Sequence, residues 1–157
     1  KRQGRLHRNF QGYSTQPDCD LIGLGVSAIG RIGATYSQNA KTLDEYYDHL
    51  DQGRLPVVRG LALNRDDLVR RAAIMALMCQ GELLIEPMEQ AWLIDFRRYF
   101  AAELDQLKDM QTQGLVEVGD EGVRVTAMGW FFVRGIAMVF DRYLQADRTR
   151  AKFSRII

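Results

Sequence analysis

The apolar pattern of this chain changes near residue 60, and this change constrains its fold more than any other feature. Residues 1–60 contain eight of the fourteen glycines, set among short apolar runs. One such run, residues 21–26 (LIGLGV), is typical of a buried strand that another backbone approaches closely. From Asn64 onward, apolar residues recur every three or four positions, which is the period of helices that pack on a core. We therefore expect two units, residues 1–60 and residues 61–157.

Start and stop signals predict the first helices. Thr42 can cap a short helix over residues 41–50, with Gly53 beyond its end. Asn64 can cap a longer helix that Gly81 ends. The predicted buried face of this longer helix consists of Leu68, Ala72, Met75 and Cys79. A third helix is expected to begin at Pro87, which suits a first helical position. The apolar stripe that follows, ended by Gly114, consists of Phe96, Phe100, Leu104 and Leu107.

The end of the unit predicts a hairpin and one more helix. Residues 115–118 and 123–126 form the expected strands, with a turn over residues 119–122. Thr126 can cap a last helix, whose apolar face we expect to pack on the Phe100 stripe. That face consists of Phe132, Ile136, Val139 and Tyr143. The order helix, helix, hairpin, helix indicates a winged-helix-like domain, so the fold class is α+β with a mostly helical C-terminal domain.

Composition indicates a cytoplasmic globular protein. Apolar residues make up 46% and charged residues 26% of the chain, close to the averages of soluble domains. No apolar run approaches the ~18–20 residues of a membrane span, and no signal peptide opens the chain. Cys19 and Cys79 lie outside any metal-binding spacing, and two thiols without a secretion signal suit a reducing compartment. We therefore expect neither a membrane partner nor a bound metal.

Residues 23–28 (GLGVSA) match the dinucleotide-binding pattern G-x-G-x-x-A, with Asp44 at a suitable distance. That fold requires an uninterrupted helix after the glycines and an acidic residue at the end of a second strand. Gly30 and Gly33 interrupt such a helix, and Asp44 falls inside a helical pattern. Glycines for close packing at a strand end are the favoured interpretation, and strand ends of α/β sheets also admit ligands.

A winged-helix pattern raises DNA binding as a second function, which the charges disfavour. Residues 61–157 contain thirteen basic and fourteen acidic residues, whereas phosphate contacts supply most of the affinity for DNA. Asp120 and Glu121 place negative charge in the expected wing, so we expect no nucleic-acid partner. The basic segment 142–155 fits either a solvated helix end or an anionic partner. His7 has no ligand at metal-binding spacing.

The most distinctive segment is residues 6–16 (LHRNFQGYSTQ), and it is similar to a stretch of the oxygen-independent coproporphyrinogen III oxidases. Residues 21–33 (LIGLGVSAIGRIG) follow at the spacing of that family. The likeness continues in order through residues 36–39 (YSQN), 59–60 (RG), 65–67 (RDD) and 153–157 (FSRII). It covers essentially the whole chain. The first segment is specific, and the later ones gain weight from their order.

The resemblance implies a radical enzyme of haem biosynthesis. In that family a [4Fe–4S] cluster cleaves S-adenosylmethionine, and the deoxyadenosyl radical takes hydrogen from two propionates of coproporphyrinogen III, which become the vinyl groups of protoporphyrinogen IX. The cluster requires a C-x-x-x-C-x-x-C loop, which this chain lacks. The resemblance therefore predicts a fragment without catalytic residues, inactive and free of cofactor when alone. Its residues 1–60 are expected to be the end of a truncated α/β radical-SAM barrel, and an electron donor is an expected partner of the full-length enzyme.

The resemblance carries few individual residues across. Ile29 matches the family position that contacts S-adenosylmethionine, and Gln11 matches a position at the cofactor end of the barrel. Gly25 is expected to make room for the cofactor. Because a strand over residues 21–26 leaves an unpaired edge and an uncovered apolar face, we also expect the fragment to self-associate through residues 1–60.

Overall fold

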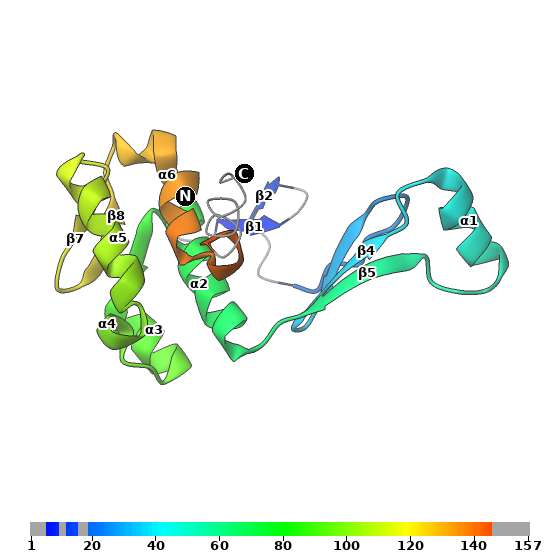
Figure 1. Ribbon diagram of the computed structural model, residues 1–157, viewed down its shortest axis with the longest axis horizontal. Helices are drawn as coiled ribbons and strands as arrows, with labels where there is room; N and C mark the ends of the chain where they lie inside the picture. The colour runs from blue at the N-terminus through cyan, green and yellow to red at the C-terminus, as the bar shows by residue number, and fades with distance from the viewer. Residues whose placement is uncertain (1–5, 10–11, 16–18, 146–157) are drawn as a thin grey trace, which may run out of the picture.

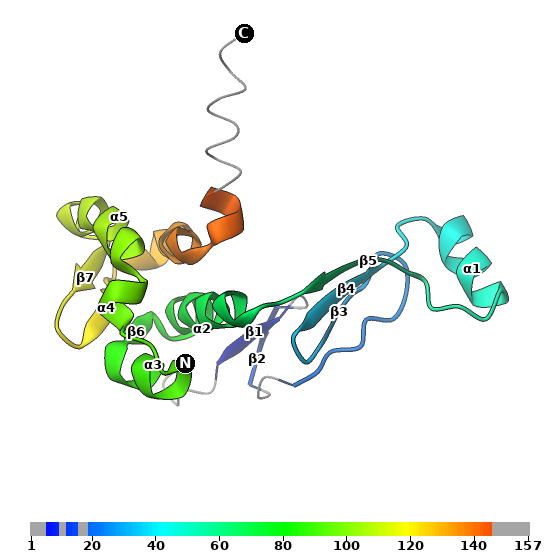
Figure 2. The ribbon, with the colours of Figure 1, turned by 60° about the horizontal axis from the view of Figure 1, so that its bottom comes forward.

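The computed structural model describes residues 6–9, 12–15 and 19–145. The molecule is elongated, with a helical body at one end and a slender arm at the other (Figures 1 and 2). We use "body" for residues 65–145 and "arm" for residues 29–62. A short hairpin of β1 (His7–Asn9) and β2 (Gly12–Ser14) lies beside the body. No helix in the described part of the chain is long and apolar enough to cross a membrane.

Three antiparallel strands build the arm, in the spatial order β3 (Ile29–Ile32), β4 (Thr35–Asn39) and β5 (Val57–Ala62). Helix α1 (Leu43–Asp51) connects β4 to β5 at the end far from the body (Figure 1). As predicted, Thr42 caps this helix and accepts a hydrogen bond from the Glu45 backbone N–H at 3.4 Å. All six residues of β5 are exposed, so the arm is a thin structure without a core of its own.

The strand predicted over residues 21–26 is wrong. Within this segment only Leu21 pairs, in an isolated antiparallel bridge with Arg31. The chain then turns, because Gly25 and Ser27 adopt positive φ angles of 97° and 58°, which a regular strand does not accommodate. The apolar run therefore forms a loop along the arm. The sheet of this region is antiparallel, and its place in a barrel stays a prediction.

The body begins with α2 (Arg65–Gln80), whose predicted cap is confirmed. Asn64 accepts a hydrogen bond from the Asp67 backbone N–H, and the Asp67 carboxylate accepts one from the Asn64 N–H, both at 3.0 Å. Gly81 ends the helix with a φ of 76°. The later helices are α3 (Ile85–Trp92), α4 (Phe96–Tyr99), α5 (Ala101–Thr112), η1 (Gly129–Phe132), α6 (Val133–Ala137) and η2 (Met138–Phe140).

A second antiparallel sheet covers one side of these helices. The predicted hairpin is confirmed as β7 (Val116–Val118) and β8 (Gly122–Val125). A third strand, β6 (Glu82–Leu84), pairs with β8 and was not predicted, because three residues between two helices carry too little pattern. The sheet order is therefore β6-β8-β7.

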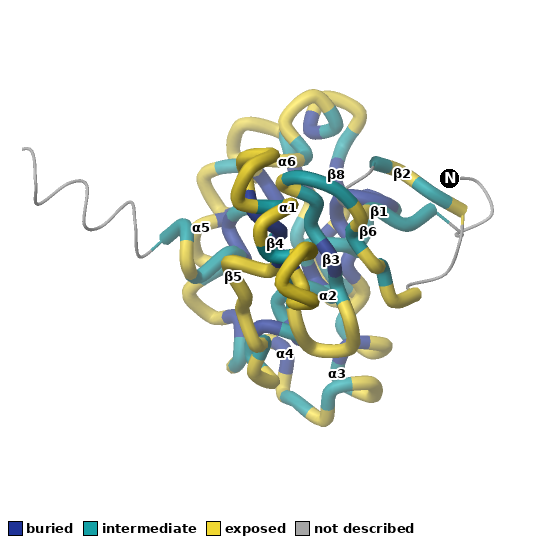
Figure 3. The backbone as a smooth tube through the Cα atoms, turned by 90° about the vertical axis from the view of Figure 1, so that its right-hand side faces the viewer, coloured by how far each residue is buried: buried dark blue, intermediate teal, exposed yellow. Residues whose placement is uncertain are grey.

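The largest fully buried side chains lie in the body, whereas α1 and β5 are mainly exposed (Figure 3). The stripe predicted from the sequence is largely confirmed, since Phe96, Phe100 and Leu107 are fully buried and Leu104 is half-buried. It does not lie on one helix, because the chain bends at Phe100 between α4 and α5. The other large fully buried residues are Phe140, Leu77, Leu83, Ile136, Val69, Val116 and Val123.

Two predicted faces need correction. On α2 the prediction is confirmed for Cys79, which is buried, whereas Leu68, Ala72 and Met75 are only half-buried. The fully buried residues of α2 are Val69, Ala73 and Leu77, because α2 packs against β1, β6, α6 and η2 on several sides. The last helix is broken into η1, α6 and η2, with Phe132 in a non-helical conformation at the first break. Phe132 is consequently 54% exposed instead of packing on the Phe100 stripe, and Tyr143 is 48% exposed.

Candidate functional site

Side chains of β4 and α1 hold the loop of residues 21–28 against the arm. The buried Asn39 donates hydrogen bonds from Nδ2 to the carbonyl oxygens of Gly23 and Gly25, at 3.1 and 2.9 Å. The Tyr46 hydroxyl accepts a hydrogen bond from the Gly25 N–H at 3.2 Å. A buried amide that binds two carbonyls fixes the loop without regular strand pairing.

This loop contains one of the three predicted site residues, Gly25, and leads into a second, Ile29. The N–H and the C=O of Gly25 both form hydrogen bonds with side chains of the arm. The role of Gly25 here is therefore to form a left-handed turn. Ile29 begins β3 and is half-buried. The loop packs closely on it, since a Cβ at Gly23 would lie 2.8 Å from the Ile29 carbonyl carbon. Gly25 therefore has a conformational role, and the contact of Ile29 with a cofactor stays a prediction. Gln11 lies outside the described residues.

The described residues do not fit an iron–sulfur cluster. They include no group of three or more His, Cys, Asp or Glu side chains that could hold a metal ion. Cys19 is exposed and Cys79 is buried in the body. Burial raises the pKa of the Cys79 thiol, an effect that the charge of Arg8 partly offsets. A thiol that stays protonated is a poor metal ligand.

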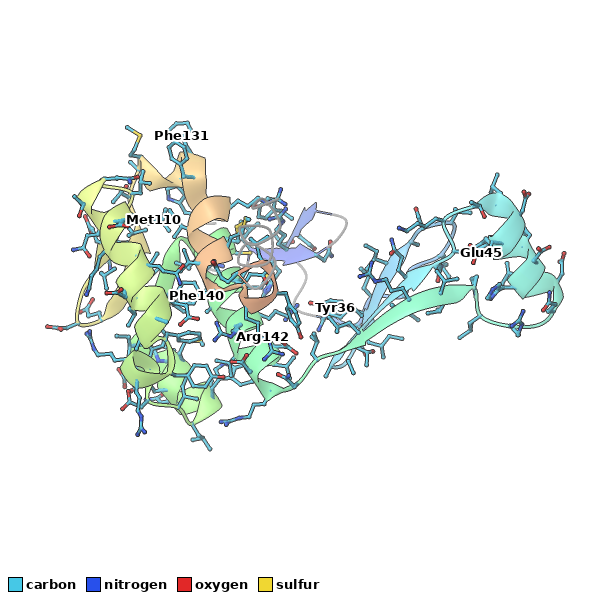
Figure 4. The ribbon with its side chains drawn as sticks, in the orientation of Figure 1. Tyr36, Glu45, Met110, Phe131, Phe140 and Arg142 are labelled. Carbon is cyan, nitrogen blue, oxygen red and sulfur yellow. The ribbon has the colours of Figure 1, made fainter. Side chains whose placement is uncertain are left out.

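A cavity of about 540 Å³ lies where β1, the arm and α2 meet. This volume is within the range of small-molecule sites, roughly 300–1,000 Å³. Tyr36 borders it from the arm and Arg142 from the body (Figure 4). Its apolar surface comes from Leu61, Leu63, Ile74, Met75 and Phe140.

Three arginines from three elements form a cationic wall of the cavity: Arg8 of β1, Arg31 of β3 and Arg71 of α2. Arg8 contacts the Met78 sulfur at 4.0 Å, and its guanidinium lies 5.5 Å from the centroid of the Tyr13 ring. Arg31 donates to the Cys19 carbonyl oxygen at 2.6 Å. Arg71 donates from Nε to the Tyr36 hydroxyl at 2.9 Å, which ties β4 of the arm to α2.

Another wall of the cavity is an ion-pair network between α2 and the segment that follows η2. Arg142 contacts Asp66 at 2.8 Å and Asp67 at 2.9 Å. Arg70 contacts Asp66 at 3.0 Å and Glu103 of α5 at 2.7 Å. The positive charges of this wall are therefore matched by carboxylates of the protein. Arg142 is the first residue of the basic segment 142–155, whose sequence left a solvated end and an anionic partner open, and its own ion pairs join it to α2.

Asp66 is the centre of this network, and its pKa reflects its partners. Partial burial by itself would raise the pKa of the carboxyl group. The hydrogen bond from Tyr99, at 2.6 Å, and the hydrogen bond and charge of Arg70 outweigh it and lower the pKa below the ordinary value of 3.8. Asp66 is therefore ionised at neutral pH and holds α2, α4 and the segment after η2 together.

Sequence reasoning missed this cavity. Arg8, Arg31 and Tyr36 stand in segments that resemble the coproporphyrinogen oxidases. Nothing in the sequence indicates that they share one site with each other or with Arg71 of α2. The available signal was their position inside those segments, and it does not report which residues meet in space.

A comparison with protein families indicates the class of domain to which the body is similar. Residues 63–132 match the family described as the HemN C-terminal domain. This range begins beside the Asn64 cap of α2 and ends with η1, so it covers the body from its first residue to the end of η1. Residues 63–132 of the chain are thus similar to this domain family.

The particular relatives are oxygen-independent coproporphyrinogen III oxidases. The protein of that name from Escherichia coli K12 is 46% identical over the whole chain, and that from Pseudomonas aeruginosa is 48% identical over 98% of it. The solved structure of the E. coli coproporphyrinogen III oxidase (HemN), described as a radical SAM enzyme, superimposes with a TM-score of 0.87 over 90% of the chain. The resemblance stated from the sequence is confirmed. The chain spans about a third of the length of these relatives.

Proposed function

We propose that this chain is the C-terminal part of an enzyme that oxidatively decarboxylates two propionates of coproporphyrinogen III to give protoporphyrinogen IX. The observation that carries the proposal is the continuous similarity of the whole chain, arm and body alike, to relatives that bear this name. An enzyme of this kind acts in the cytoplasm, with an electron donor that supplies the reducing equivalent.

The radical chemistry belongs to S-adenosylmethionine and a [4Fe–4S] cluster, and no group of the described residues could hold that cluster. This chain contributes parts of the protein that surround and position these groups. Residues 1–60 provide the edge of the barrel that contains these groups, and residues 61–157 provide a helical domain against it. The order of α2, β6, the helices α3 to α5, and the β7–β8 hairpin supports a winged-helix-like arrangement for that domain.

A DNA-binding role for the same domain has less support. In the turn between β7 and β8, Asp120 and Glu121 are exposed, and Asp120 pairs with Arg97 at 3.2 Å. A wing of this charge repels the phosphate backbone. The enzymatic proposal also accounts for the arm, which a DNA-binding module does not need.

Within the enzyme, Ile29 is proposed to form an apolar wall for S-adenosylmethionine, with Gly25 shaping the loop in front of it. Gln11 is proposed to lie at the same end of the barrel. Asn39 supports this arrangement, because its two hydrogen bonds hold the loop beside β3.

The test is a chimera in which this chain replaces the matching third of the E. coli enzyme. Under anaerobic conditions, with S-adenosylmethionine, a reductant and coproporphyrinogen III, the chimera is expected to form protoporphyrinogen IX, measured by fluorescence after oxidation. A chimera that folds with a full cluster but cleaves no propionate contradicts the proposal. The isolated chain, treated with iron and sulfide, is expected to develop no stoichiometric cluster absorbance.

The cofactor wall is tested in the same chimera with Ile29→Asp. A carboxylate beside an apolar cofactor surface is costly to desolvate, so the affinity for S-adenosylmethionine should fall while the cluster absorbance is retained. The matched control is Ile32→Asp, because Ile32 ends the same strand and is 56% exposed. Equal cofactor affinity in both variants removes Ile29 from the site.

A further inference from the structure

We propose that the cavity between β1, the arm and α2 binds a carboxylate carried by an apolar organic molecule. The geometry of the cavity supports this ligand class by itself. The identification of that carboxylate as a propionate of coproporphyrinogen III rests on the function proposed above.

The first argument is the origin of the cationic wall. Arg8, Arg31 and Arg71 come from a hairpin, a sheet and a helix that are far apart in the sequence, and they border the same cavity. A guanidinium carries five N–H donors in a planar fork that suits a carboxylate. The cavity therefore presents this kind of donor from three separate elements.

Arg8 gives the clearest indication. Within the described part of the chain its contacts are to neutral groups, the Met78 sulfur and the Tyr13 ring. Its backbone is fixed in β1, paired with Tyr13 of β2. This half-buried guanidinium thus borders the cavity with its charge unmatched by a described carboxylate, which is the usual state of an anion-binding arginine before its ligand arrives.

The second argument concerns the acidic residues of the cavity, Asp67 and Asp141. Asp67 accepts hydrogen bonds from the Tyr143 hydroxyl and the Asn64 N–H and pairs with Arg142. Asp141 accepts hydrogen bonds from two backbone N–H groups of the segment after η2, at 3.0 and 3.1 Å. Both carboxylates therefore already have partners within the body.

The third argument is the apolar surface between the two walls. Ile74 and Met75 of α2 and Leu61 of β5 face the same space as the arginines. A small inorganic anion would leave this surface in contact with water, whereas an organic acid covers it. The cavity therefore favours a carboxylate on an apolar body over phosphate or sulfate, and its size suits one edge of a tetrapyrrole.

The experiment measures binding to the chain itself, without any activity. Coproporphyrin III, the stable oxidised ring with the same four propionates, is titrated with the chain and followed by its fluorescence. The comparison ligand is its neutral tetraamide with ethanolamine, which keeps the ring and removes the charges. We expect the tetraamide to bind at least about tenfold more weakly, and rising salt to weaken only the tetraacid.

Variants assign the site. Arg8→Gln and Arg31→Gln are each expected to weaken tetraacid binding about tenfold, the usual effect of losing one charge-assisted hydrogen bond, with no change for the tetraamide. Arg8→Lys should recover part of the loss, which a purely structural role of Arg8 would not produce. The control is Arg98→Gln, because Arg98 is exposed on α4 and does not border the cavity. Circular dichroism checks that each variant is folded.

The outcomes separate this inference from the proposed function. Equal affinity for tetraacid and tetraamide, or equal effects of the Arg98 and Arg8 variants, overturns the carboxylate site. An active chimera whose KM for coproporphyrinogen III is unchanged by Arg8→Gln and Arg31→Gln overturns the propionate identification and leaves the function standing. An inactive chimera, with the binding pattern retained in the isolated chain, overturns the function and leaves the carboxylate site standing.

Discussion

Replacing Phe100 with Ala tests the packing of the body most directly. Phe100 is fully buried at the bend between α4 and α5. Its ring centroid lies 5.1 Å from that of Phe96, 5.0 Å from Tyr99 and 5.2 Å from Phe140. The Arg70 guanidinium lies 5.6 Å from the same ring. Side chains of three elements, α4, η2 and α2, therefore meet on this ring.

The expected loss of unfolding free energy is about 3–5 kcal/mol, the usual cost of removing a buried Phe ring. The upper half of this range is favoured, because aromatic pairs add about 0.5–1.5 kcal/mol each beyond their buried area. The assay is urea unfolding followed by circular dichroism. With a slope of about 2 kcal/mol per molar, the midpoint should fall by about 2 M.

The control is Phe131→Ala, because Phe131 is 85% exposed on η1. Its replacement should change stability by less than about 0.5 kcal/mol. A loss below about 1 kcal/mol for Phe100→Ala would show that the rings around it do not form the core, and the assignment of α4 and α5 to one packed layer would fail.

Three further predictions concern other parts of the molecule. Because the folded-state pKa of Asp66 is lowered, its contribution is present above its ordinary pKa of 3.8 and is lost as the pH falls through the folded value. Asp66→Asn should therefore cost about 1.5–3 kcal/mol at pH 7, and the difference from the parent chain should shrink below pH 4 in urea unfolding. Gly81→Ala should destabilise by more than Gly114→Ala, because both glycines have positive φ but only the Cβ at Gly81 meets the Trp130 ring, at 2.2 Å; equal losses in thermal unfolding would refute the clash. The whole chain should sediment as a dimer and the chain without residues 1–60 as a monomer, whereas a monomeric whole chain at high micromolar concentration would contradict self-association through the exposed apolar residues of the arm.

Local chemistry made part of the fold predictable. The caps of α1 and α2 followed from Thr42 and Asn64, because a side-chain oxygen at such a position bonds a nearby backbone N–H in almost any context. Gly81 and the β7–β8 turn followed from residues that tolerate unusual backbone angles. These features depend on four or five neighbouring residues, and the sequence contains all of them.

Features that depend on tertiary packing were not predictable. The run LIGLGV reads as a strand, but Asn39 and Tyr46 bind its backbone groups and a loop results. Phe132 continues a helical stripe, but the break between η1 and α6 turns it outward. The cavity unites segments from β1 to the end of η2, and no local pattern reports such a meeting. Ile29 and Gln11 came from resemblance alone, and their roles stay predictions.

The arm leaves and rejoins the rest of the molecule beside α2, and Arg71 on α2 bonds Tyr36 of the arm across the cavity. The cavity consequently has one wall on the arm and another on the body, and the arm and the body share no core. A change in the angle between the arm and the body would change the separation of those walls and hence the fit of anything between them. Suppose that a molecule binds more tightly when the two walls are close together than when they are apart. By thermodynamic reciprocity, its binding then favours the arrangement with close walls by the same factor as the ratio of the two affinities, and so restrains the arm. Hydrogen exchange of the β4 and β5 amides therefore reports occupancy of the cavity, even though most of these amides lie on the arm and not in its lining.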